Sequence, residues 1–131
     1  MSLKISLKAG EKIFVGGAVI QNGSTPCEIL ILNEAPLLRE KDILTEESAD
    51  SHCKRIQLLV QLIYMDPANL KAYQKRYAEL VEELLIAAPS AAALVAEINH
   101  HLAFGEYYQA LKSAKRLVAY EQELIEHAKS A

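Results

Sequence analysis

Basic side chains on a short alternating segment near the N-terminus are the residues best suited to chemistry. Between Leu3 and Lys8, polar and apolar residues alternate, so Lys4, Ser6 and Lys8 share one face of a strand. Lysine ammonium groups contact phosphates, and each such contact makes binding salt-dependent. An arginine such as Arg39 adds a planar face for stacking and a fork of donors. The candidate nucleic-acid contacts are Arg39, Lys8, Lys4, Lys12 and Lys41.

The charge balance offers a second interpretation of the same residues. Residues 1–44 contain five basic and five acidic side chains, and the whole chain has a net charge of −3. This balance is not that of a non-specific nucleic-acid binder, so any such contact would rest on a local patch. Lysines on the polar face of a strand commonly only protect its edge. Arg39 precedes Glu40, Lys41 and Asp42, and could equally pair with a carboxylate there.

Catalytic and metal-binding patterns are not evident in the sequence. His100 and His101 are adjacent, and neighbours on a helix point about 100° apart, so the pair cannot chelate one ion. Cys27 and Cys53 lie in different segments without metal-ligand spacing, which predicts reduced thiols. No Ser-His-Asp order, phosphate loop or dinucleotide fingerprint occurs. We therefore expect no enzymatic activity, no metal and no cofactor.

Five short strand signals must position the basic residues. They fall at residues 3–8, 12–15, 18–20, 28–32 and 37–39. Gly16-Gly17 predicts a tight turn, and Asn22-Gly23 is a strong hairpin signal. The apolar run from Glu28 to Leu32 predicts a central strand buried on both faces. Because such a small sheet cannot bury both faces alone, it must pack against helices, pair with a second copy, or do both.

Helical periodicity replaces the strand pattern from about Ser51, which can cap the first helix. Asp66-Pro67 begins a second helix, Pro89-Ser90 a third and Glu106 a fourth. We predict an α+β fold, with a small N-terminal antiparallel β-module of about five short strands (residues 1–48) and a C-terminal bundle of about four α-helices (residues 49–131). No signal peptide or membrane-spanning segment is visible, so a cytoplasmic location is expected.

Several longer segments resemble one known family. They are LKISLKAGEKIFV from Leu3, GAVI from Gly17, LLREKDILTEE from Leu37 and YMDP from Tyr64. With these segments the chain resembles the FlbT family, the flagellum biosynthesis repressors, over essentially its whole length. The resemblance implies a post-transcriptional regulator that binds the 5′ untranslated leader of flagellin mRNA and promotes its degradation or represses its translation.

The order of features in residues 3–44 is also similar to that of the carbon storage regulator CsrA family. Both have Gly-Glu after the first strand, an Asn-x-Pro-like break, and a short last strand that leads into Arg-Glu. In that family the arginine of the last strand contacts RNA together with residues of the first strand, and Arg39 is the matching position. Leu7 and Lys8 occupy the basic pair of the first strand, so the match there is partial. The resemblance also implies a homodimer as one arrangement, with strands interlocked between two chains, unless the added helices cover those strands within one chain.

Two hypotheses about function stay open. The first is an RNA-binding regulator whose partner is the flagellin mRNA leader, with no role for DNA or a membrane. The second is a protein–protein adaptor for flagellin, a flagellin chaperone, a flagellar regulatory protein or a secretion component. The neutral β-module, the acidic total charge and the many tyrosines of the helical part favour the second, because tyrosine is enriched at protein interfaces.

Overall fold

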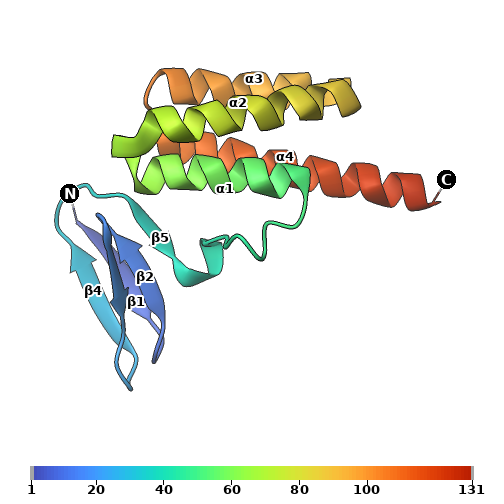
Figure 1. Ribbon diagram of the computed structural model, residues 1–131. Coiled ribbons are helices and arrows are strands. Elements are labelled where there is room, and N and C mark those ends of the chain that lie inside the picture. Colours follow the sequence, from blue (N-terminus) through green and yellow to red (C-terminus); the bar gives the residue numbers. More distant parts are fainter. Residues whose placement is uncertain (1, 131) are drawn as a thin grey trace. The chain divides into compact units, whose positions relative to one another are not determined.

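The structure is a computed structural model of the chain, and it describes residues 2–130. The chain divides into two compact units, Met1–Ile43 and Leu44–Ala131. Strands make up the first unit and four α-helices the second (Figure 1). The predicted α+β fold class, with an antiparallel β-part before a helical part, is therefore confirmed.

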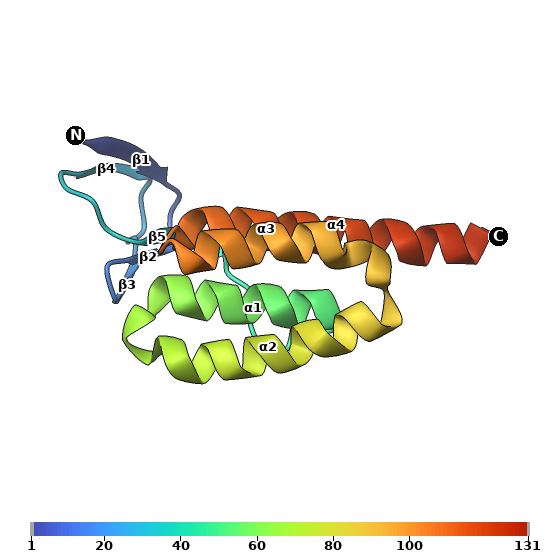
Figure 2. The same cartoon turned by 90° about the horizontal axis from the view of Figure 1, so that it is seen from above.

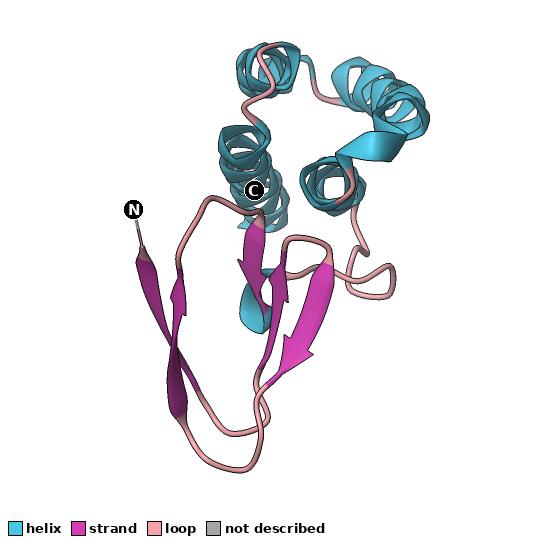
Figure 3. Ribbon diagram, turned by 90° about the vertical axis from the view of Figure 1, so that its left-hand side faces the viewer, coloured by secondary structure: helices cyan, strands magenta, loops and turns pink. Residues whose placement is uncertain are grey.

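The β-unit consists of two small antiparallel sheets (Figure 3). Its strands are β1 (Leu3–Leu7), β2 (Lys12–Val15), β3 (Ala18–Gln21), β4 (Cys27–Ile31) and β5 (Leu37–Arg39). One sheet pairs β1 with β4, and the other has the order β3-β2-β5. Neither sheet could be stable alone at this size, so each needs a covered face.

A shared apolar core lies between the inward faces of the two sheets. Ile5, Leu7 and Ile13 form its centre, with exposed fractions of 5% or less. The partly buried side chains packed against it are Val15, Cys27, Ile29, Ile31 and Leu37. The period of two in β1 therefore has the predicted effect: Ile5 and Leu7 are buried, and the alternate residues Lys4 and Ser6 are exposed.

The turn at Gly16-Gly17 is the predicted tight hairpin. It joins Val15 to its cross-strand partner Ala18, and both glycines have positive φ, 56° and 97°. Two consecutive positive φ values match the two-residue hairpin turn that suits the twist of the strands, and glycine adopts them without a Cβ penalty.

The predicted hairpin at Asn22-Gly23 is wrong, because β3 and β4 belong to different sheets. Asn22 instead holds together the loops at this end of the unit. Its side-chain amide donates to the carbonyls of Lys8 (2.8 Å) and Thr25 (2.9 Å), and its Oδ1 accepts from the thiol of Cys27 (3.2 Å). Local sequence therefore identified a structured turn, and side-chain hydrogen bonds determined its form.

The prediction that residues 28–32 form a central strand buried on both faces is also wrong. β4 pairs only with β1, and its residues alternate between partly buried and exposed. Ile29 and Ile31 face the core, whereas Leu30 is 59% exposed and Leu32, just beyond the strand, is 71% exposed. A two-stranded sheet that packs through one face leaves the other face exposed to solvent. An apolar run in the sequence therefore does not by itself show that both faces of the strand are buried.

The helical unit contains α1 (His52–Met65), α2 (Leu70–Ala87), α3 (Ala92–Ala103) and α4 (Tyr107–Ser130). α1 packs against α2 and α4, and α3 packs against α4 (Figure 2). Short 3₁₀ turns η2 (Pro67–Asn69) and η3 (Pro89–Ala91) precede α2 and α3, while η1 (Glu40–Asp42) belongs to the β-unit. The fully buried large apolar side chains of the bundle are Ile56, Val60, Ile63, Ile98, Leu111 and Leu117.

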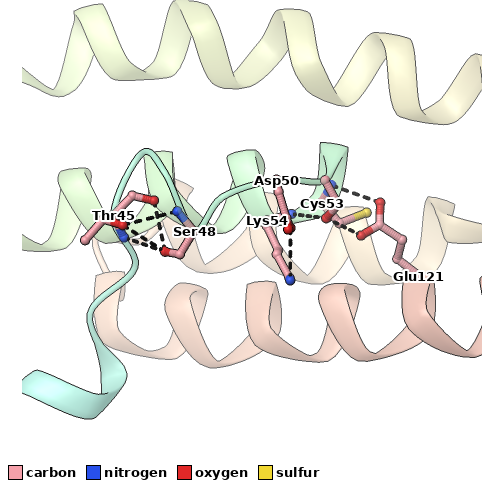
Figure 4. A network of polar contacts seen from close by, with 7 residues as sticks. Thr45, Ser48, Asp50, Cys53, Lys54 and Glu121 are labelled. Carbon is pink, nitrogen blue, oxygen red and sulfur yellow. Dashed lines mark hydrogen bonds and ion pairs between the residues drawn. The ribbon is translucent and has the colours of Figure 1, made fainter.

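Side chains also fix the start of the helical unit. Ser51 caps α1 as predicted, because its hydroxyl accepts from the backbone N–H of Lys54. The side-chain amide of buried Gln61 both accepts from the N–H of Leu44 (2.9 Å) and donates to its carbonyl (3.0 Å). A Thr45–Ser48 turn follows (Figure 4). Among the described helices, none is long and apolar enough to cross a bilayer.

Replacing Gly17 should test the hairpin. A Cβ at Gly17 would meet no atom within 4 Å, so the effect of Gly17→Ala would come from the backbone conformation alone. We expect the β-unit to lose about 1–3 kcal/mol of unfolding free energy, because alanine is strained at this φ. Urea unfolding followed by amide NMR signals of the β-unit measures this loss. Gly23→Ala is the matched control, since Gly23 also lies in open space but lacks a positive φ; an equal loss there would contradict the explanation.

Candidate nucleic-acid interface

All five predicted contact residues lie in the β-unit. Lys4 is in β1, Lys8 directly follows it, Lys12 begins β2, Arg39 ends β5, and Lys41 is in η1. The four lysines are exposed, and Arg39 is partly buried. They are not one cluster, because different strands and turns present them.

One groove brings two of these residues together. It has a volume of about 760 Å³ and is open to solvent. Its lining residues are Ser6, Leu7, Lys8, Pro26, Cys27, Glu28 and Arg39, and we call it the Lys8–Arg39 groove. Lys4, Lys12 and Lys41 do not line it. The groove thus follows the ends of β1 and β4, where Ser6 lies opposite Glu28 and Leu7 opposite Cys27.

The guanidinium of Arg39 is held by neighbours within the unit. Nη2 donates to the backbone carbonyl of Ser6 at 2.5 Å. It also donates to the two carboxylate oxygens of Glu11, both at 3.2 Å. Nε is buried and has no hydrogen-bond partner among the described residues. The side chain of Arg39 is 32% exposed, so one part of it remains accessible from solvent. The sequence left open whether Arg39 pairs with a carboxylate; it does, and its partner is Glu11.

Glu11 is the central acceptor of this junction. Its carboxylate accepts from the backbone N–H of Lys8 (2.9 Å) as well as from Arg39. These contacts, the Lys8 hydrogen bond first and then Arg39, lower the pKa of the Glu11 carboxyl from its ordinary value of 4.5. Glu11 therefore stays ionised at neutral pH and neutralises the charge of Arg39.

The lysines differ in how far their charge is neutralised. Lys4 pairs with Glu28 at 2.9 Å, but both side chains are more than half exposed, so the pair is weak and easily exchanged. Among residues 2–130, no ion pair holds Lys8, Lys12 or Lys41. Since Arg39 is neutralised by Glu11, Lys8 is the cation without an ion pair among the described residues that lines the groove, and Glu28 lines it as well.

Sequence reasoning missed Glu11 and Asn22 as parts of the site. Gly10-Glu11 stood out only as the Gly-Glu that follows the first strand, and no spacing rule joins Glu11 to an arginine 28 residues later. Asn22 carried a hairpin signal that concealed its cross-loop hydrogen bonds. Asparagine and glycine together mark a turn, but they do not say which carbonyls the asparagine will meet.

A second polar network lies in the helical unit, at the start of α1 (Figure 4). The Ser51 hydroxyl donates to Glu121 Oε1 (2.5 Å), and the backbone N–H of Cys53 donates to Oε2 (3.2 Å). Burial, with a contribution from Glu121, raises the pKa of the Cys53 thiol to about 12. The network satisfies free N–H groups of α1 and keeps Cys53 as a thiol, so it has a structural rather than a nucleophilic role.

The fold and these surfaces define an α+β protein in which a small β-unit carries an open groove lined by Lys8 and Arg39, and four α-helices form the second unit. The family described as "Flagellar protein FlbT" matches residues 3–125. The chain therefore belongs to the FlbT family.

Named relatives cover nearly the whole chain. A probable flagellum biosynthesis repressor protein FlbT 1 from Bradyrhizobium diazoefficiens is 41% identical over 125 residues, 95% of this chain and 85% of the relative. A probable flagellum biosynthesis repressor protein FlbT from Rhodopseudomonas palustris is 40% identical over 95% of this chain and 98% of its own. The flagellum biosynthesis repressor protein FlbT of Caulobacter vibrioides is 33% identical over 99% and 94%. No solved structure matches the chain.

Removing the charge of Glu11 should change how the β-unit responds to acid. Because the pKa of Glu11 is lowered in the folded state, its contribution to stability is present above its ordinary pKa and is lost as the pH falls through the folded value. We expect Glu11→Gln to be less stable than the wild type at neutral pH, with the difference shrinking below about pH 4.5.

The measurement for Glu11→Gln is urea unfolding of the β-unit, followed by amide NMR signals at several pH values. Glu28→Gln is the control, since Glu28 makes only the exposed pair with Lys4 and should cause little change. A Glu11→Gln defect that is the same at neutral and acid pH would contradict the ionic role.

The two cysteines should differ in reactivity. Cys53 is 1% exposed and its thiol has a raised pKa, whereas Cys27 is partly exposed. With a water-soluble disulfide reagent at neutral pH, we expect Cys53→Ser to label at close to the wild-type rate, and Cys27→Ser to label slowly until denaturant is added. Rapid labelling of native Cys27→Ser would show that Cys53 is accessible.

Proposed function

We propose that this chain is a repressor of flagellum biosynthesis that binds the 5′ untranslated leader of flagellin mRNA and promotes its degradation or represses its translation. Membership of the FlbT family supports the flagellar part of the proposal, because the named relatives are flagellum biosynthesis repressors. The RNA part rests on the β-unit. Its single strongest support is Lys8, a lysine without an ion pair in the described chain that lines an open groove next to the guanidinium of Arg39.

The outward face of β1 extends this surface. Lys4, Ser6 and Lys8 occur at every second position, so about 6.6 Å separates each from the next along one face. Two lysines on that face would contact backbone phosphates, and the Ser6 hydroxyl would donate or accept between them. Lys12 and Lys41 would add charge outside the groove.

Arg39 would act mainly by positioning in this proposal. Its hydrogen bond to the Ser6 carbonyl connects β5 to β1, and its pair with Glu11 holds the turn after β1. These contacts fix the wall of the groove next to Lys8. The exposed part of the guanidinium would offer a flat surface on which an unpaired base could stack.

The low net charge favours recognition of a folded element with single-stranded loops over tight binding to any RNA. Glu11 neutralises Arg39, and Glu28 pairs with Lys4, so few charges are available for phosphates. Specific RNA binders mostly recognise splayed bases in loops and bulges. We therefore expect affinity to fall only moderately with salt, as for two or three phosphate contacts.

A gel-shift titration of the full chain against the flagellin mRNA leader tests the proposal. We expect Lys8→Gln to weaken binding several-fold and to lower the salt slope by about 0.7, the value for one phosphate contact on a single strand. Lys75→Gln is the matched control, because Lys75 is an exposed lysine of the helical unit. Equal binding by wild type and Lys8→Gln, or no binding of leader RNA at moderate salt, would refute the proposed interface.

A further inference from the structure

The inner stripe of α4 continues beyond the part that the bundle covers. Ala110, Leu111, Ala114 and Leu117 lie on this stripe and are at most 1% exposed. The next positions at the same helical spacing include Leu124 and Ile125, each 39% exposed. Figures 1 and 2 both show the C-terminal part of α4 extending past the ends of the other helices of its unit. The apolar stripe of α4 is therefore longer than the part that the other helices of its unit cover.

An apolar groove lies where α4 leaves the bundle. Its volume is about 320 Å³. α2 and the turn after it contribute Leu84, Ala87 and Ala88, and α4 contributes Leu117, Leu124 and Ile125. We call it the α4 groove. Small alanines on one side and branched side chains on the other leave a trough that an inserted aliphatic side chain would fill.

The charges around the α4 groove are acidic. Its lining contains Glu83 and Glu121 and no lysine or arginine. Glu121 is occupied by Ser51 and the N–H of Cys53. The side chain of Glu83 is 60% exposed and lies 3.9 Å from Nε2 of His52, which also lines the groove. Exposed Glu123 and Glu126 flank the apolar pair on α4, against one lysine, Lys129, a turn further on. The groove thus combines an apolar floor with a negative rim.

We propose that the α4 groove binds an amphipathic helix of a partner protein that carries cationic side chains beside its apolar stripe. A helix would fit an apolar trough lined mainly by α2 and α4, with His52 and Cys53 of α1, because anchors at i, i+3 or i+4, and i+7 lie along one line. Cationic flanks match Glu83, Glu123 and Glu126. A second copy of this chain is a poor occupant, since its own α4 would bring Glu123 and Glu126 against the same carboxylates.

This interaction is independent of the proposed RNA contact. The residues of the α4 groove belong to the helical unit, and those of the Lys8–Arg39 groove belong to the β-unit. An acidic rim also disfavours RNA at the α4 groove. Each activity can therefore fail without the other.

The test uses the full chain and a fluorescent designed peptide helix with leucines on one stripe and lysines beside it. We expect saturable binding, with Leu124→Ser and Ile125→Ser each weakening it by about tenfold, because each removes a branched side chain that the bound helix would bury. Glu83→Gln should weaken it less and reduce its dependence on salt. Ile86→Ser is the matched control, since Ile86 is 77% exposed on α2 and does not line the groove.

Two further peptides make the outcome decisive. One has the same composition in scrambled order, and the other has glutamates in place of the lysines; both should bind at least tenfold more weakly. Lys8→Gln should leave peptide binding unchanged, and Leu124→Ser should leave RNA binding unchanged. Absence of saturable binding, equal binding of the scrambled or acidic peptide, or an equal effect of Ile86→Ser would overturn the proposal. So would self-association of the chain that Ile125→Ser abolishes, because the groove would then hold a second copy.

Discussion

The β-unit depends on the junction that Arg39 makes between its two sheets. Arg39 ends β5 in the three-stranded sheet, and it reaches the carbonyl of Ser6 in the two-stranded sheet and the carboxylate of Glu11 in the connecting turn. Apolar contacts between the sheets are non-directional, and five short strands supply few of them. The hydrogen bonds of the partly buried arginine depend on distance and angle, so they fix how the two sheets are placed against each other. Each one sets a distance between segments that are not neighbours in a sheet. The groove beside Lys8 is a consequence of this junction, so stability and the candidate interface share the same residues.

Patterns with a local physical cause were predictable from the sequence. The alternation of β1 follows from the strand period, the turn at Gly16-Gly17 from the positive φ that glycine allows, and the start of α1 from the cap of Ser51. The role of residues 28–32 was not predictable in the same way. An apolar strand in a two-sided sheet and one on the edge of a small two-stranded sheet have the same composition, and only the pairing partners distinguish them.

The site was predictable as a set of residue types but not as a geometry. Lys4 was placed on the outward face of β1 correctly, because periodicity alone decides which face a strand residue occupies; Lys8 is exposed but lies just beyond the strand, which ends at Leu7. The state of Arg39 depends on Glu11, which is distant in sequence, and on a backbone carbonyl, which has no sequence signature at all. Contacts of this kind form only when separate elements pack together. The sequence alone therefore left two possibilities for Arg39, a contact with RNA or a pair with a carboxylate. The α4 groove could not be predicted from the sequence either. Helical periodicity identifies the apolar stripe of α4, but not the point at which the other helices stop covering it.

The two units carry surfaces of opposite character. On the β-unit, Lys8 lines an open groove and has no ion pair in the described chain, while the α4 groove is apolar with exposed carboxylates at its edge. The acidic edge of the α4 groove would repel RNA, whereas Lys8 would attract it. In the two proposals, these separate surfaces would let one small chain hold a nucleic acid and a basic helix without competition for one site. The lysines that favoured the RNA-binder hypothesis lie in the β-unit, and the tyrosines that favoured the adaptor hypothesis lie in the helical unit.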